Sequence, residues 1–110
     1  MPEKTDYLYL NHINDACSQI GVYLGNIDKD KFIRNNLVQD GVIRQLEIIG
    51  EAVRKISTKT RDTYKEIDWG DITGMRDKLI HDYTGVDLEI VWKTVKEDVP
   101  ELKRQIEVLL

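Results

Sequence analysis

The stretch DKFIRNNLVQDGVIRQLEIIGEAVRKIS, Asp30 to Ser57, contains the longest helical pattern in the chain. Its apolar residues recur at steps of three or four, the spacing that places side chains on one face of a helix. They are Ile33 or Leu37, then Val38, Val42, Leu46, Ile49, Val53 and Ile56. Gly41 and Gly50 interrupt this pattern. Because glycine costs about 1 kcal/mol relative to alanine in a helix interior, a close helix contact or a bend would explain both. We predict one long helix here.

A second helix is predicted before this stretch, from Tyr7 to Leu24, where apolar residues again recur at steps of three or four. Thr5 is a candidate cap for its start, and Gly25 is expected to end it. After the long helix, the segment Thr58 to Asp68 is rich in charges and threonine and has no apolar period. We predict that this segment is a connection between two helical hairpins.

Two more helices follow the connection. Asp68 or Asp71 can cap the first, which buries a stripe of apolar residues and ends at Gly85. The stripe consists of Ile72, Met75, Leu79 and Tyr83, with Trp69 packing at its start. Asp87 caps the last helix, which runs to the C-terminus. Pro100 lies inside it, so a kink between Lys96 and Pro100, or a new helix start there, is expected. Four helices with short joints predict an all-α, antiparallel four-helix bundle.

Composition limits the class of protein. A chain of 110 residues with 41% hydrophobic and 33% charged residues is expected to fold as a single domain over residues 1–110. The lone Cys17 cannot form an intrachain disulfide, which favours a reducing cytoplasm. No apolar run approaches the roughly 20 residues that span a bilayer, so no membrane partner is expected. The net charge of −4 argues against a diffuse positive field, so any RNA contact must be local.

The motif MRDKLIHDYTG, Met75 to Gly85, carries the chemistry of the chain. It holds Arg76, His81 and Tyr83 within about two helical turns. Arginine binds a phosphoryl group through a planar fork of donors, and histidine transfers protons near neutral pH. The three residue types therefore suit phosphate chemistry.

The spacing Arg, four residues, His, one residue, Tyr, its context RDKLIHDY and the upstream QLEIIGEAVRKIS resemble the HepT-type HEPN domains. The resemblance covers most of the chain. It implies a small helical ribonuclease, usually a toxin, that is paired with a minimal nucleotidyltransferase antitoxin and works as a dimer with a shared cleft. In such systems the nucleotidyltransferase transfers AMP onto the tyrosine of the motif, which corresponds to Tyr83 here. The expected partners are therefore RNA (tRNA or mRNA), a cognate nucleotidyltransferase and a second copy of the chain.

Cleavage of RNA without a metal needs a base for the 2′-hydroxyl, a positive charge near phosphorus and an acid for the 5′-oxygen. Arg76 suits the charge, and His81 suits proton transfer. The motif supplies one histidine per chain, and Arg76 and His81 lie about 140° apart around a helix. A single copy thus looks incomplete, whereas two copies across a two-fold axis would supply two histidines and two arginines.

Two further residues are candidates for a supporting role. Asp77 stands four residues before His81, the spacing at which side chains touch on a helix, and could fix its tautomer; otherwise it is an exposed acid. The ladder Arg44, Glu47, Glu51 and Arg54 reads first as a solvated helix face. In the alternative, Glu51 or Arg44 borders the cleft and orients Arg76.

Other assignments are less favoured. Asp77, His81, Asp82 and Asp87 show no recognisable spacing of metal ligands, so neither a metal nor a cofactor is expected. Arg61 and Lys65 could contact RNA but read first as loop charges, and His12 reads as a surface or boundary residue. Trp69 and Trp92 fall on apolar stripes and are predicted to be core. The main alternative function is non-catalytic: a nucleotide- or partner-binding helical subunit of a nucleotidyltransferase complex.

Overall fold

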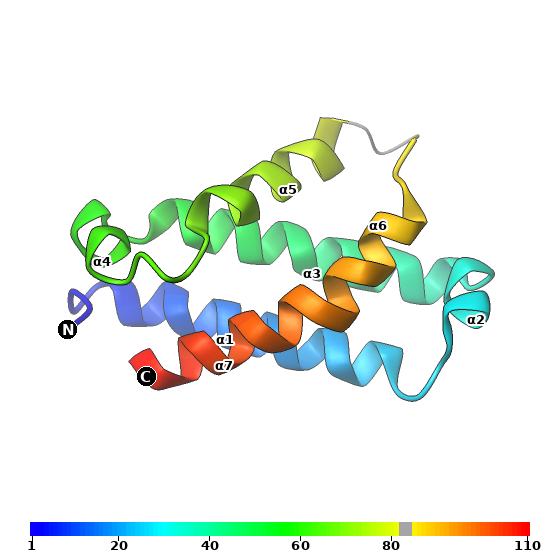
Figure 1. The fold of residues 1–110 in the computed structure, drawn as a ribbon, viewed down its shortest axis with the longest axis horizontal. Coiled ribbons are helices and arrows are strands. Elements are labelled where there is room, and N and C mark those ends of the chain that lie inside the picture. The colour runs from blue at the N-terminus through cyan, green and yellow to red at the C-terminus, as the bar shows by residue number, and fades with distance from the viewer. Residues whose placement is uncertain (82–84) are drawn as a thin grey trace.

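The protein is all-helical over the residues that the structure describes, which confirms the predicted fold class (Figure 1). The computed structural model describes residues 1–81 and 85–110, and for Ile80 and His81 it describes the backbone alone. The elements are α1 (Asp6–Leu24), α2 (Lys29–Ile33), α3 (Asn36–Lys55), α4 (Thr58–Thr63), α5 (Trp69–His81), α6 (Leu88–Lys93), a π-helical turn η1 (Thr94–Asp98) and α7 (Val99–Leu109). Within the described ranges, no helix is both long enough and apolar enough to cross a membrane.

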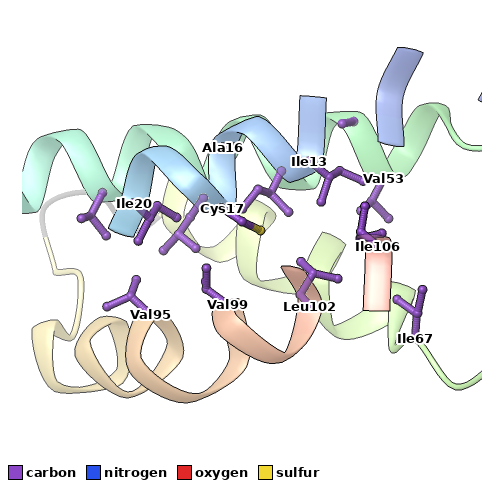
Figure 2. Close-up of a cluster of buried hydrophobic side chains, with 14 of the residues drawn as sticks. Ile13, Ala16, Cys17, Ile20, Val53, Ile67, Val95, Val99, Leu102 and Ile106 are labelled. Carbon is purple, nitrogen blue, oxygen red and sulfur yellow. The ribbon is translucent and has the colours of Figure 1, made fainter. Parts of the chain in front are cut away.

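The longest helix, α3, lies at the centre of the helix packing. It packs against α1 on one side and α5 on the other, while α7 packs against α1 (Figure 1). The core forms where the apolar stripe of α1 meets that of α7, as Figure 2 shows for Ile13, Cys17, Ile20, Val99 and Ile106. The apolar stripes predicted for these helices are therefore confirmed.

The single helix predicted over Asp30–Ser57 is wrong, because the chain breaks after α2 and restarts at α3. The Asn35 side chain accepts a hydrogen bond from the Val38 amide at 3.1 Å and so caps α3. The buried Gln39 amide donates to the carbonyl oxygens of Phe32 and Ile33 at 2.8 and 2.9 Å. These bonds satisfy the last carbonyls of α2, so the break costs little.

The segment Thr58–Asp68, predicted as a connection without regular structure, contains the short helix α4. Ser57 caps it by accepting from the Thr60 amide. The cap is fixed by Asp6, a buried carboxylate at the start of α1, which accepts bonds from the Ser57 amide, the Ser57 hydroxyl and the Thr60 hydroxyl at 2.9, 2.7 and 2.6 Å. The cap predicted from Thr5 is wrong, since its side chain makes no capping bond.

Three further helix ends follow the sequence, whereas the described part of α5 stops at His81 and residues 82–84, before the end predicted at Gly85, lie outside the described residues. Gly25 ends α1 with φ of 51°, Asp68 accepts from the Asp71 amide at the start of α5, and Asp87 caps α6. Around Pro100 the coil is irregular but unbroken, so the new helix start is not observed: the π-helical turn η1 leads directly into α7, which carries the proline in its first turn. Proline has no backbone N–H to donate to the preceding turn, and the wider π-helical turn accommodates this missing hydrogen bond.

Asp6 gives a pH-dependent prediction. Burial alone would raise the pKa of Asp6, but the hydrogen bonds from Thr60 and Ser57 outweigh it and hold the pKa below its usual value. A lowered pKa stabilises the fold above the unfolded pKa of about 3.9, and this stability is lost as the pH falls through the folded pKa. We expect Asp6→Ala to lower the free energy of unfolding at pH 7 by about 2–4 kcal/mol in urea titrations.

The matched control is Asp15→Ala, which removes an exposed acid from the same helix and should change stability by less than about 0.5 kcal/mol. The wild type should have a higher free energy of unfolding than Asp6→Asn, and this difference should shrink as the pH falls toward 3. A difference in the free energy of unfolding that is constant with pH would contradict the role assigned to the Asp6 charge.

Candidate active site

The described part of the motif, Met75 to His81, lies on α5, and α5 is held against α3 at one very close contact. A methyl group at position 50 of α3 would lie 2.1 Å from Cβ and 2.5 Å from Cγ of Arg76. Only glycine leaves room for this approach, because such distances are far below van der Waals contact. The close helix contact predicted from the glycines of the long segment is thus confirmed at Gly50, and it presses the stem of Arg76 onto the backbone of α3.

The guanidinium of Arg76 lies between two carboxylates. Its Nη2 is 3.5 Å from Oε1 of Glu51, and its Nη1 donates to Oδ1 of Asp77 at 3.3 Å. Arg54, one turn after Glu51 on α3, also pairs with Asp77. The four side chains form a chain of alternating charge that joins α3 to α5, with two cations and two anions.

This arrangement leaves the guanidinium available to an incoming anion. The Arg76 side chain is 21% exposed, whereas Glu51 and Asp77 are 49% and 44% exposed. Both ion pairs are longer than the 2.7–2.9 Å that is typical of tight charge-assisted bonds. Nε of Arg76 is buried and has no hydrogen-bond partner among the described atoms. A phosphate can therefore replace a half-exposed carboxylate at the Nη groups without moving the arginine stem.

The structure brings together three of the five residues that the sequence singles out, namely Arg76, Asp77 and Glu51. The backbone of His81 ends α5, and its side chain lies outside the described residues. Tyr83 also lies outside them. The contact proposed between Asp77 and His81 thus involves a side chain that the structure does not describe.

Arg54 is the residue of this cluster that sequence reasoning did not assign to the site. Arg54 belongs to the charge ladder of the long helix and lies four residues after Gly50 and three after Glu51. That spacing puts it on the same face as both, which is a signal that could have identified it. Arg44 of the same ladder pairs instead with Glu47, at 3.4 Å.

Several other candidate residues lie elsewhere. Trp69 is buried and its Nε1 donates to the Tyr64 carbonyl at 3.1 Å. Trp92 is half-buried and packs on Phe32 with ring centroids 5.3 Å apart, so the core role predicted for both tryptophans is confirmed. His12 is exposed on α1, and its ring meets that of Tyr9 edge to face.

Arg61 and Lys65 border a shallow depression beside α4. Among the side chains that the structure describes, no three of His, Cys, Asp or Glu lie together as ligands for a metal ion. The side chains of Asp82 and His81 are outside the described set.

Residues 13–109 match the protein family described as "Ribonuclease HepT-like". The chain belongs to the HepT-like ribonuclease family. A protein of Thermococcus cleftensis named "Probable ribonuclease HepT" is 45% identical to this HepT-like chain, over 92% of each. A "Putative RNase" of Caldanaerobacter subterraneus subsp. tengcongensis is 37% identical over 97% of this chain and 96% of its own length.

A further "Putative RNase", from Methanocaldococcus jannaschii, is 40% identical over the whole of this chain and 95% of its own length. No solved structure matches the chain significantly. The family relationship confirms the resemblance found from the RDKLIHDY and QLEIIGEAVRKIS segments.

Proposed function

We propose that this HepT-like chain is a metal-independent RNA endonuclease that acts as the toxin of a toxin–antitoxin pair. The observation that carries the proposal is the placement of Arg76: a fixed, partly exposed guanidinium, set by Gly50 and flanked by exchangeable carboxylates, five residues before His81 on the same helix. Membership of a family described as ribonucleases and the names of its relatives support RNA as the substrate.

The proposed reaction divides the work between Arg76 and two histidines. The guanidinium of Arg76 binds the scissile phosphate and stabilises the negative charge that develops on it. His81 of one protomer takes the proton of the ribose 2′-hydroxyl, the 2′-oxygen attacks phosphorus, and the bond to the 5′-oxygen breaks. His81 of the partner subunit gives its proton to the leaving 5′-oxygen. The products are a 2′,3′-cyclic phosphate and a 5′-hydroxyl, so the step consumes no water.

Glu51, Asp77 and Arg54 act as positioning residues in this scheme. Glu51 and Asp77 hold the guanidinium on the α5 side of α3 in the free protein and release it to the phosphate. Arg54 binds Asp77, so that the carboxylate released from Arg76 still has a cationic partner. This exchange lets a protein of net charge −4 bind RNA at one place while product binding stays weak.

We further propose that a cognate nucleotidyltransferase restrains the nuclease by modifying Tyr83. The Tyr83 hydroxyl attacks the α-phosphorus of ATP and pyrophosphate leaves, so that AMP becomes linked to the ring. Tyr83 follows Arg76 by seven residues and His81 by two, and this short separation in the chain supports a position near the guanidinium. The added phosphodiester would then compete with RNA for Arg76 by charge and by occupancy.

The proposal is tested by incubating the purified protein with total RNA in EDTA. We expect cleavage that leaves 2′,3′-cyclic phosphate ends, identified by mass spectrometry. His81→Ala and Arg76→Ala should each lower the rate by at least about 100-fold. The control is Arg44→Ala, which removes an exposed arginine paired with Glu47 and should leave the rate unchanged. Cleavage that needs an added divalent metal, or RNA that binds at Arg76 without being cut, would contradict the proposal.

The shared cleft is tested with a heterodimer of one wild-type and one His81→Ala protomer, isolated through two different affinity tags. If the base and the acid come from the two protomers, this heterodimer should keep less than about one-hundredth of the wild-type rate, because one of the two proton transfers is lost. Independent subunits would instead retain half of the rate. That result would refute the two-histidine site and leave the ribonuclease assignment standing.

A further inference from the structure

A groove of about 560 Å³ lies between α5 and α7. α5 packs on α3, and α7 packs on α1 (Figure 1). The apolar part of the groove comes from three helices and consists of Leu46, Ile49, Ile72, Met75, Val99 and Leu102. Of these, Ile72 and Met75 are partly exposed and the other four are buried, and the volume falls within the range of ligand-binding clefts.

The rim of the groove is acidic. Its carboxylates come from the loop before α5, from α5 itself, and from η1 and α7: Glu66, Asp68, Asp71, Asp98 and Glu101. Of these, Glu101 pairs with Arg104, and among the described lining residues Lys78 is the one cation. The hydrogen bond and the repulsion between Asp71 and Asp68 raise the pKa of Asp71, with smaller effects of desolvation and of Asp98. The carboxylates are thus crowded without enough counter-charge.

We propose that this groove binds a cationic amphipathic helix of a partner protein. A helix laid between α5 and α7 presents apolar side chains at i, i+3, i+4 and i+7 to the apolar floor. Lysines or arginines that flank this stripe then reach the carboxylates on both walls. Apolar floor and acidic rim together specify this occupant, because neither a polar basic segment nor a neutral apolar helix satisfies both.

The same chemistry disfavours other occupants. RNA and an anionic membrane surface both carry phosphates, which the rim carboxylates repel. A second copy of the chain has a net charge of −4 and brings no excess of cations. The cleft proposed to be shared with a second copy is built around the arginine cluster, and Asp77 of this cluster lies about 200° around the helix from Met75, which lines the groove.

Occupation of the groove has a consequence for the arginine cluster. α5 is held mainly by α3, so a helix bound against Ile72 and Met75 would clamp α5 from its second side. Arg76 lies next to Met75 in the chain and would be fixed more firmly on Gly50. The binding itself is independent of the proposed nuclease activity; its effect on that activity rests on the proposed function.

The experiment measures binding of two fluorescently labelled synthetic helical peptides by anisotropy. Both carry leucines at i, i+3, i+4 and i+7; one is flanked by lysines and the other by glutamates. We expect the lysine peptide to bind at least about tenfold more tightly to the intact chain. Asp98→Lys and Glu101→Lys should each weaken it by about fivefold or more. The control Glu97→Lys changes an exposed acid of η1 that does not line the groove and should bind as the wild type does.

The apolar floor is tested with Met75→Asp, whose helical content is first checked by circular dichroism, and which should lose binding of the lysine peptide. Equal affinity for the two peptides, or equal affinity in the rim variants and Glu97→Lys, overturns the proposal. A change in the oligomeric state of Asp98→Lys, measured by light scattering, also overturns it and assigns the groove to a second copy.

Discussion

The contact between Arg76 and the bare backbone of Gly50 is the constraint on which the rest of the site depends. With a side chain at position 50, α5 could not approach α3 to the present distance, since even a methyl group would lie 2.1 Å from Cβ of Arg76. The approach brings the guanidinium to Glu51, the next residue of α3, and brings Asp77 to Arg54 one turn later. One helix thus provides both the surface on which α5 docks and the charges that hold its arginine.

The two sides of α5 differ in electrostatic character: one carries balanced charges and the other an excess of carboxylates. On one side, two arginines balance two half-exposed carboxylates, so that a phosphate can exchange into the cluster without a large net field. On the other side, the groove toward α7 is rimmed by carboxylates that exclude phosphate. A single helix of thirteen residues can therefore bind an anion on one side and a cationic protein segment on the other.

Much of this organisation could be predicted from local patterns, and the rest depended on partners far away in the chain. The apolar stripes, the caps at Asp68 and Asp87 and the helix irregularity near Pro100 are local signals, and the structure confirms them. The apolar pattern does not predict the break before Asn35, because the break is stabilised by hydrogen bonds from the buried Gln39 side chain to the carbonyls that end α2. The helix α4 was missed because Asp6, 51 residues before Ser57, organises its cap.

At the site, the sequence selected Arg76, Asp77 and Glu51 from residue chemistry and spacing, and the structure places them together. It did not select Arg54, because a charge ladder on a helix face looks solvated until its partner is known, and that partner, Asp77, lies 23 residues away.

The most direct measurement of the central contact is a double-mutant cycle between positions 50 and 76, followed by urea unfolding. Gly50→Ala should destabilise the protein by about 1–3 kcal/mol through overpacking, although alanine is the better helix former by about 1 kcal/mol. In the Arg76→Gly background, which removes the opposing Cβ, the same substitution should be neutral or stabilising. Gly74→Ala on α5, where nothing lies within 4 Å, is the control and should stabilise. A Gly50→Ala protein that is as stable as Gly74→Ala would contradict the account.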